Sequence, residues 1–307
     1  MLLIRLSCLA LVLAASLHPA VAAESYIVVD NQTGTILAGE NRDEKLPVAS
    51  LTKVATAMVV LDFAKLKDAD LSALATVPAV AFDNGITSPI GLQLGDQMSL
   101  RDLVYGALLA SDNVAATTLA NHIGTLLPNV EQLDPVGNFV AHMNALARSL
   151  NMRRTRFLNP TGFDNMEDSG PFSTASDMAR LVRYAYDSAG FAFYVAQSSR
   201  QVHILRAGAD IPVDIRNTNE LIGQDGIDGV KTGRTRRAGD CLILSGDRQP
   251  EVKREGEQVF ITPRRLTVVL LRSSDRFGEG LALMRQGWSL YDTWAAGGRK
   301  STRSGTL

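Results

Sequence analysis

One helical segment sets the strongest constraint on how this chain folds. From Val54 to Ala64 only Thr56 and Asp62 are polar, so a helix over residues 51–66 would be apolar on nearly every side. A helix of this kind is stable only in the middle of a domain, with other elements packed around it. The chain has 307 residues, of which 46% are hydrophobic, and that is enough to build such a domain.

The period of the hydrophobic pattern changes along the chain on either side of this helix. Residues 25–30 and 35–39 predict a hairpin, because Asn31-Gln-Thr-Gly34 between them is a typical turn sequence. Helical patterns follow at 99–109, 114–123, 139–150 and 176–189, then strand patterns at 229–232, 241–245 and 266–271, then a helix at 279–294. We predict an α/β (α+β) fold in which one sheet is split in the sequence by an inserted, mostly helical subdomain at about 67–215. Residues 24–296 would form a single domain, with a charged loop at 247–258 and a flexible tail at 297–307.

The first 23 residues have the pattern of a targeting segment. Arg5 precedes an apolar run over residues 6–17, and small residues at 20–23 suit a signal peptidase. The run is too short to cross a hydrocarbon layer of about 30 Å comfortably. We therefore predict a cleaved secretory signal and a mature protein with no transmembrane anchor. The alternative is a retained membrane anchor.

Composition excludes several classes of function. Lys and Arg together number 31 against 32 Asp and Glu, so the strongly basic field of a nucleic-acid binder is missing. Cys8 lies in the predicted signal and Cys241 in an apolar run, which predicts a small core residue rather than a disulfide. His122, His142 and His203 have neither a G-x-S-x-G partner nor H-E-x-x-H spacing, so we expect no metal and no cofactor.

Ser50 and Lys53 are the first candidates for catalysis. They open the apolar helix three residues apart, which places both side chains on one face. A desolvated, neutral lysine can take the proton of a serine hydroxyl, and unpaired N–H groups at a helix start can stabilise an oxyanion. The simpler interpretation is a capping serine followed by an ordinary lysine, but an idle charge in so apolar a helix is costly.

A second motif, Ser111-Asp-Asn113, lies at a break between two helical runs. A hydroxyl there could relay protons, and an amide could hold a peptide group of a substrate. Taken alone, the same residues also suit ordinary helix capping.

A third motif, Lys231-Thr232-Gly233, lies on a predicted edge strand. A cation and a hydroxyl there make a receptor for a carboxylate, and glycine lets a ligand backbone approach closely. The charge of Lys231 would also lower the pKa of Lys53. The simpler interpretation is a strand that ends in a turn.

The order S-x-x-K, S-x-N, K-T-G is the signature of active-site serine penicillin-recognising enzymes. From about Tyr26 to Trp294 the sequence resembles the D-alanyl-D-alanine carboxypeptidases, low-molecular-mass penicillin-binding proteins of the S11 type. Besides the motifs already given, the matching segments are Asp30-x-x-Thr-Gly34, Pro47-Val-Ala-Ser-Leu-Thr-Lys53, Asn159-Pro-Thr-Gly-Phe-Asp164, Ser173-Thr-Ala-Ser-Asp177 and Asn217-Thr-Asn219.

This resemblance implies a β-lactamase/penicillin-binding transpeptidase-like fold, an antiparallel sheet flanked by helices. It also implies that Ser50 is acylated with Lys53 as its base, and that Ser111 passes a proton toward the leaving D-alanine. Asn113 would bind the substrate and steady Lys53.

The remaining roles implied by the resemblance concern the third motif. Lys231 and Thr232 would receive the terminal carboxylate, and the backbone N–H groups of Ser50 and Arg234 would form the oxyanion hole. Arg234 departs from the family, where His is frequent, and places an extra cation by the carboxylate pocket.

The function implied is a secreted, periplasmic or wall-associated DD-carboxypeptidase. It would remove the terminal D-alanine from peptidoglycan stem peptides, with β-lactams as covalent inhibitors. A DD-endopeptidase acting on cross-links would use the same residues. A class A β-lactamase would need a glutamate for its deacylating water, and residues 155–158 contain none. A non-hydrolysing β-lactam sensor or scaffold would keep the same motifs without turnover, and so would an inert descendant of such an enzyme.

Overall fold

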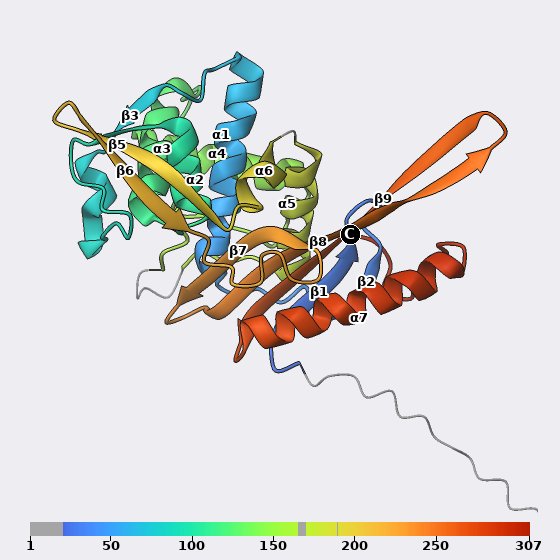
Figure 1. Ribbon diagram of the computed structural model, residues 1–307. Coiled ribbons are helices and arrows are strands. Elements are labelled where there is room, and N and C mark those ends of the chain that lie inside the picture. Colours follow the sequence, from blue (N-terminus) through green and yellow to red (C-terminus); the bar gives the residue numbers. More distant parts are fainter. Residues whose placement is uncertain (1–20, 165–169, 189) are drawn as a thin grey trace, which may run out of the picture.

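The computed structural model describes residues 21–164, 170–188 and 190–307, so most of the predicted signal peptide lies outside the described residues. Its main sheet has five antiparallel strands in the order β2-β1-β9-β8-β7. Helix α7 (Arg276–Ala296) packs on one face of this sheet, and the helical part of the molecule covers the other (Figure 1). The strands in sheet order are Ile36–Glu40, Ser25–Asp30, Gln258–Ser273, Gly239–Glu255 and Ile227–Thr235.

Helix α1 (Lys53–Lys67) occupies the middle of the helical part and contacts four other helices. Every residue from Lys53 to Leu61 is buried, which confirms the central position predicted from its apolar sequence. The other helices are α2 (Leu100–Leu108), α3 (Asn113–Leu126), α4 (Pro135–Ser149), α5 (Ala175–Asp187) and α6 (Phe191–Val195), with 3₁₀ segments at Ala49–Thr52 and Ala79–Gly85.

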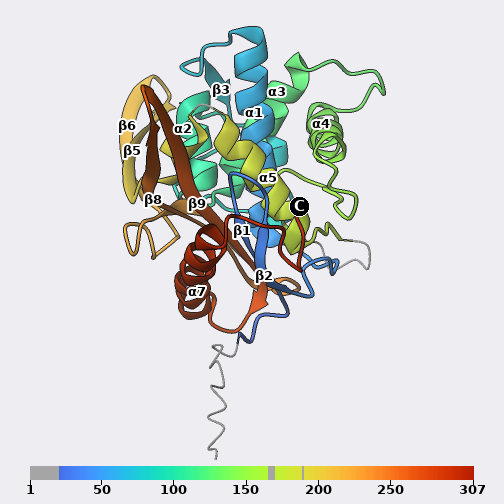
Figure 2. The same ribbon diagram turned by 90° about the vertical axis from the view of Figure 1, so that its right-hand side faces the viewer.

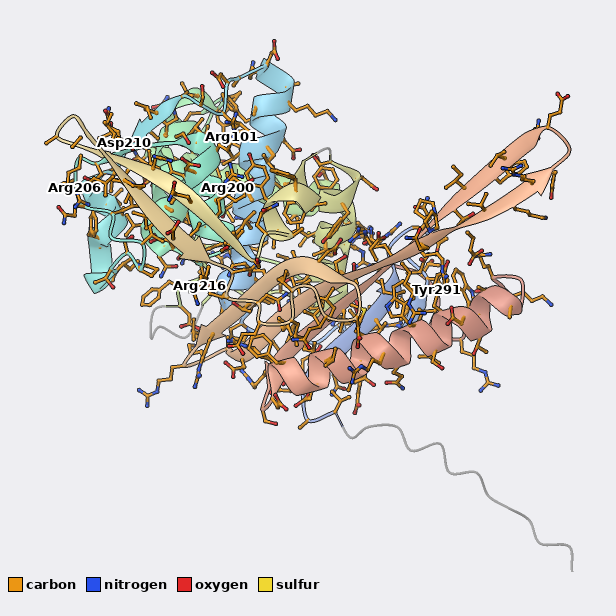
Figure 3. All side chains as sticks on the ribbon, viewed as in Figure 1. Arg101, Arg200, Arg206, Asp210, Arg216 and Tyr291 are labelled. Atoms are coloured by element: carbon orange, nitrogen blue, oxygen red, sulfur yellow. The ribbon has the colours of Figure 1, made fainter. Side chains whose placement is uncertain are left out.

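The helical part also carries a second antiparallel sheet, which the sequence analysis did not predict (Figure 2). Its strands are β3 (Leu74–Thr76), β4 (Gln97–Ser99), β5 (Ser199–Arg206) and β6 (Ala209–Arg216). Arg206, labelled in Figure 3, lies at the end of β5. It pairs with Asp96 at 2.7 Å and ties β5 to the segment before β4. The alternation of buried Val202 and Ile204 with exposed residues was the signal for this hairpin.

The predicted charged loop at residues 247–258 is wrong. Strands β8 and β9 continue through it as a two-stranded ribbon that projects beyond the sheet and closes around Gly256, whose φ is +62° (Figure 1). Both faces of this ribbon are open to solvent. Its β8 half is mostly charged and its β9 half carries the consecutive exposed residues Val259, Phe260 and Ile261, so neither shows the alternation by which strands are recognised.

The C-terminal segment, expected to be a flexible tail, lies along the free edge of β2. The Leu307 N–H donates to the Gly34 oxygen at 3.0 Å, and the Ile36 N–H donates to Gly305 at the same distance. An edge strand presents unpaired backbone groups, and this segment covers part of them. On α7, Trp288 and Tyr291 are buried; Figure 3 labels Tyr291 on this helix.

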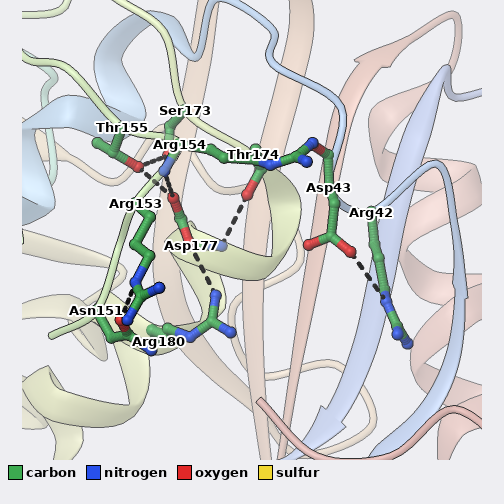
Figure 4. A network of polar contacts seen from close by, with 10 residues as sticks. All are labelled: Arg42, Asp43, Asn151, Arg153, Arg154, Thr155, Ser173, Thr174, Asp177 and Arg180. Atoms are coloured by element: carbon green, nitrogen blue, oxygen red, sulfur yellow. Dashed lines mark hydrogen bonds and ion pairs between the residues drawn. The ribbon is translucent and has the colours of Figure 1, made fainter.

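One polar network fixes the start of α5 (Figure 4). Thr174 caps the helix, and the Asp177 carboxylate accepts hydrogen bonds from the Arg154 N–H, the Thr155 hydroxyl and the Arg180 guanidinium at 2.8–2.9 Å. The segment from Ser173 to Asp177, which contributes to the family resemblance, therefore anchors the chain ahead of the loop at 157–164.

Candidate active site

Ser50 lies in the 3₁₀ turn Ala49–Thr52, which leads directly into α1. Lys53 is the first residue of α1 and is fully buried, while Ser50 is half-buried. The predicted placement of a hydroxyl and an amine at the start of the buried helix is confirmed. The residue before Ser50, Ala49, has a left-handed backbone, with φ of +48°.

Three oxygen atoms surround the Lys53 amine. Nζ lies 2.8 Å from Ser50 Oγ, 2.7 Å from Asn113 Oδ1 and 2.9 Å from the carbonyl oxygen of Thr161. The structure therefore brings together Ser50, Lys53 and Asn113, as the resemblance implied. Thr161 was missed as a contact because it contributes a main-chain carbonyl, which has no signature in the residue type.

Burial lowers the pKa of Lys53 to about 7, although the carboxylate of Asp112 opposes this effect. Asp112 is buried and caps α3 by accepting from the Ala115 N–H at 2.8 Å. Its carboxylate also accepts from the Ser88 hydroxyl and from the Ile90 N–H. From the sequence, Asp112 is expected only to cap a helix. Its position makes it the acidic group that acts on the Lys53 amine.

Ser111 occupies the break between α2 and α3 with a left-handed backbone, φ +60°. Its side chain is half-buried and, within the described ranges, has no hydrogen-bond partner. Asn113 directs its amide oxygen at Lys53, because an amine donor requires an acceptor there. The Asn113 amide nitrogen is thereby left available as a donor.

Strand β7 carries the K-T-G motif on the edge of the main sheet, as predicted. At Gly233 the strand passes close to the turn that holds Ser50. A Cβ built on Gly233 would lie 3.1 Å from the Val48 oxygen and 3.2 Å from the Ser50 nitrogen. The glycine was expected to admit a ligand backbone. The structure shows in addition that Gly233 admits the backbone of the Ser50 segment.

Lys231 is 1% exposed and donates from Nζ to the Thr232 oxygen at 2.9 Å. Burial lowers its pKa well below the ordinary value, and the charges of Lys53 and Arg276 lower it further. We expected the repulsion between the two lysines to lower the pKa of Lys53. In the structure burial dominates at Lys53, and the repulsion acts on Lys231.

Two groups missed by sequence reasoning support the K-T-G strand. The Thr232 hydroxyl lies 2.7 Å from the hydroxyl of Thr218, which belongs to the Asn217-Thr-Asn219 segment. Arg276, at the start of α7, donates to the Gly233 oxygen at 3.2 Å. The segment of Thr218 was noted for its resemblance to the family but given no role, and Arg276 lies 43 residues after Gly233, where no local spacing indicates it.

Arg234 points away from this cluster. Its side chain is 77% exposed, and its Nε lies 3.4 Å from Asp240 Oδ1. The extra cation expected beside the carboxylate pocket is therefore a solvent-exposed group at the end of β7.

No group of three or more His, Cys, Asp or Glu side chains suited to a metal ion occurs among the described residues. What the cluster offers is a hydroxyl, a buried amine of lowered pKa, a free amide donor and a second buried lysine. Such a set is suited to nucleophilic acyl transfer, with the amine as the base.

The fold and this cluster define a serine-type hydrolase of the penicillin-recognising kind. The model of the Peptidase_S11 family, described as D-alanyl-D-alanine carboxypeptidase, matches residues 13–252. The chain belongs to this family.

Curated relatives bear both of the names weighed from the sequence. A D-alanyl-D-alanine endopeptidase of Pseudomonas aeruginosa is 33% identical over 244 residues, which are 74% of this chain and 68% of that protein. The carboxypeptidase DacC of Escherichia coli is 30% identical over 284 residues, 90% of this chain and 63% of the relative. DacF of Bacillus subtilis is 32% identical, and the match spans only 54% of its length.

Solved structures agree with the fold. The Streptomyces K15 DD-transpeptidase matches with a TM-score of 0.75 and 26% identity, over 88% of this chain and 98% of that one. Penicillin-binding protein D2 of Listeria monocytogenes, in its ampicillin-bound form, matches with a TM-score of 0.68 and 25% identity, over 88% of this chain and 99% of that one. The predicted transpeptidase-like architecture is therefore confirmed. In the part of the chain that the structure describes, no helix is both long and apolar enough to span a membrane.

Proposed function

We propose that this protein removes the terminal D-alanine from peptidoglycan stem peptides through an acyl-enzyme on Ser50. The observation that carries this proposal is the set of partners around Lys53. Asn113 Oδ1 and the Thr161 carbonyl are pure acceptors, at 2.7 and 2.9 Å, whereas the Ser50 hydroxyl can also donate. A neutral amine has two N–H donors for the first two and a lone pair for the Ser50 proton.

The first step is attack of Ser50 Oγ on the carbonyl carbon between the two terminal D-alanines. Lys53 accepts the hydroxyl proton as the new C–O bond forms, which its lowered pKa allows near neutral pH. The negative charge that develops on the carbonyl oxygen is received by the backbone N–H groups of Ser50 and Arg234. Arg234 directly follows Gly233, which closely approaches the Ser50 nitrogen.

The second step breaks the C–N bond. The leaving amine takes a proton through Ser111, whose hydroxyl has no other partner among the described residues, and D-alanine departs. Water then attacks the acyl-enzyme with Lys53 again as base, and the shortened peptide is released while Ser50 recovers its proton.

Lys231 and Thr232 recognise the terminal carboxylate. Burial and nearby cations hold the pKa of Lys231 low, and a bound carboxylate would favour its charged form again. The Asn113 amide nitrogen donates to a peptide carbonyl of the acyl portion. Carboxylate recognition of this kind also explains inhibition by β-lactams, which carry a carboxylate beside the amide that acylates the serine.

Mass spectrometry of the purified protein with benzylpenicillin tests the acyl-enzyme. We expect a covalent adduct on Ser50 that is lost in Ser50→Ala, and an unmodified wild-type protein would refute the proposal. Incubation with a defined pentapeptide should release free D-alanine. Acylation without release of D-alanine would favour a β-lactam sensor or scaffold.

A DD-endopeptidase is the second candidate, because relatives in Pseudomonas aeruginosa and Escherichia coli bear that name at 33% and 32% identity. Digestion of purified cross-linked muropeptides separates the two activities. We propose the carboxypeptidase as the main activity and expect the pentapeptide to be cleaved faster than the cross-linked dimer. A class A β-lactamase is disfavoured because Lys53 contacts the Thr161 carbonyl where such an enzyme would need a glutamate. The acyl-enzyme formed with benzylpenicillin should accordingly be hydrolysed slowly.

We further propose that residues 1–23 are a cleaved signal and that the mature protein works in the periplasm or at the cell wall. Peptidoglycan lies outside the inner membrane, so the substrate supports this location. The test is N-terminal sequencing of the protein isolated from cell fractions, and we expect it to begin at or near Glu24.

A further inference from the structure

Arg264 and Arg265 are neighbours on β9, and ion pairs hold them on opposite faces of the main sheet. Arg264 faces α7, where Nη2 donates to Asp292 at 2.7 Å and the guanidinium lies over Trp288. Arg265 faces α5, and its guanidinium carbon lies 4.3 Å from the centre of the Tyr186 ring. The two side chains are equally sheltered, at 20% and 19% exposed.

Arg265 reaches from β9 across β8 to β7. Its Nη1 donates to Ser245 Oγ on β8 and to Asp228 Oδ1 on β7, both at 2.7 Å. Its Nη2 lies 3.4 Å from Asp247. One guanidinium thus links three adjacent strands, and it ends on the strand that carries the K-T-G motif.

Asp228 is the irregular residue of β7. Ile227 pairs with Gly246 and Gly229 pairs with Ser245, so Asp228 has no partner of its own on β8. Such a bulge changes the phase of the strand that follows it, and a slip of one residue turns every later side chain to the opposite face. Lys231 follows Asp228 by only three residues, so its direction depends on this bulge.

The bulge is held on its other sides as well. The Tyr186 hydroxyl lies 3.4 Å from Asp228 Oδ1, and Asn219 Nδ2 donates to the Gly229 oxygen at 3.0 Å. A Cβ on Gly229 would lie 2.7 Å from the Tyr186 hydroxyl, so the strand lies directly against that ring. In this set, Arg265 is the only cation that pairs with the Asp228 carboxylate within the described residues.

We propose that Arg265 is a positioning residue that fixes the bulge at Asp228 and thereby the phase of Lys231 and Thr232. It does not touch the substrate. The Gly233 end of β7, which leads to the Arg234 N–H of the proposed oxyanion hole, is held separately by the Arg276 guanidinium and by the turn at Ser50. The inference rests on the proposed function, since it assumes that Lys231 and Thr232 receive a carboxylate. Ser50 and Lys53 are held by α1 and its neighbours and do not depend on Arg265.

The test compares two probes on the intact protein. Benzylpenicillin carries a carboxylate, and a peptidyl boronic acid that lacks one adds to the same serine. In Arg265→Met we expect the second-order rate of acylation by benzylpenicillin to fall by about tenfold to a hundredfold, as for a displaced binding group. The inhibition constant of the boronic acid should stay within about twofold of wild type.

Arg264→Met is the matched control, because it removes an equally sheltered, ion-paired arginine from the opposite face of the same strand. It should lower thermal stability to a similar extent and leave both probes unchanged. Arg265→Lys keeps the charge opposite Asp228 and should recover part of the lost acylation rate. The double variant Asp228→Asn/Arg265→Met should lose less of the acylation rate than the product of the two single-variant losses predicts. Both changes break the same interaction, so their effects are not independent.

The proposal is overturned if Arg265→Met weakens the reaction with benzylpenicillin and the binding of the boronic acid equally. It is also overturned if Arg264→Met shows the same selective loss of acylation by benzylpenicillin. If Arg265→Met does not fold, Asp228→Asn and Arg265→Lys decide between these results. A wild-type protein that benzylpenicillin does not acylate would refute the proposed function instead, and the two failures are thereby distinguishable.

Discussion

The backbone nitrogen of Ser50 and the α-carbon of Gly233 belong to segments far apart in sequence that touch in the structure. A Cβ on Gly233 would lie 3.2 Å from that nitrogen and 3.1 Å from the Val48 oxygen. Contacts of this length require the neighbouring backbone to move. The proposed oxyanion hole uses N–H groups from both of these segments, so their separation determines its geometry.

Gly233→Ala should therefore impair acylation more than stability. We expect the second-order rate with benzylpenicillin to fall by about tenfold to a hundredfold, because the added methyl pushes β7 away from Ser50. Stopped-flow or gel-based acylation assays measure the rate. Gly297→Ala, at the end of α7, meets nothing closer than 3.4 Å and serves as the control. Full activity of Gly233→Ala would argue against an oxyanion hole at this contact.

The pH dependence of acylation should follow Lys53. Burial lowers its pKa to about 7, and only the neutral amine can accept the Ser50 proton. The rate should therefore be lost as pH falls through about 7 and should level off above that value. Acylation by benzylpenicillin measured from pH 5 to 9, with circular dichroism to verify folding, gives the midpoint. A rate that stays constant from pH 9 down to pH 5 would contradict a base with the lowered pKa of Lys53.

Removing the charge of Asp112 should shift this profile. The carboxylate raises the pKa of Lys53, so Asp112→Asn should move the midpoint to lower pH. Asparagine can still accept from the Ala115 N–H, and the altered contact with Ser88 should cost about 1 kcal/mol of unfolding free energy. Ser99→Ala removes a comparable helix cap at α2, away from Lys53, and should destabilise the protein without moving the midpoint. An upward shift in Asp112→Asn would contradict the electrostatic role.

Sequence patterns predicted those features of the site that depend on residues close together in the chain. The pairing of Ser50 with Lys53 follows from their spacing on a helix, and the burial of α1 follows from its apolar sequence. The meeting of Asn113 with Lys53 has no local signature and was inferred from the family resemblance. The Thr161 carbonyl could not be identified, because any residue type supplies the same oxygen.

Long-range charge pairing was the main gap in prediction. In the sequence Arg265 is one of two adjacent arginines with no local partner, and only strand order brings it to Asp228. Strands β8 and β9 were predicted over a few residues each, because their outer halves form a ribbon exposed on both faces. Hydrophobic periodicity reports burial, so an exposed ribbon escapes it.

The side chain of Arg234 should contribute little to acylation, although its backbone N–H belongs to the proposed oxyanion hole. It is 77% exposed, and its ion pair with Asp240 lies in solvent, where such pairs contribute at most about 1 kcal/mol. Arg234→Gln should therefore keep the rate with benzylpenicillin within about threefold of wild type. Arg254→Gln on the projecting ribbon makes the same change of charge away from the site and corrects for the loss of overall attraction to an anionic probe. A loss of about a hundredfold confined to Arg234→Gln would show that the guanidinium itself holds the carboxylate, and Lys231 would then have to share that role.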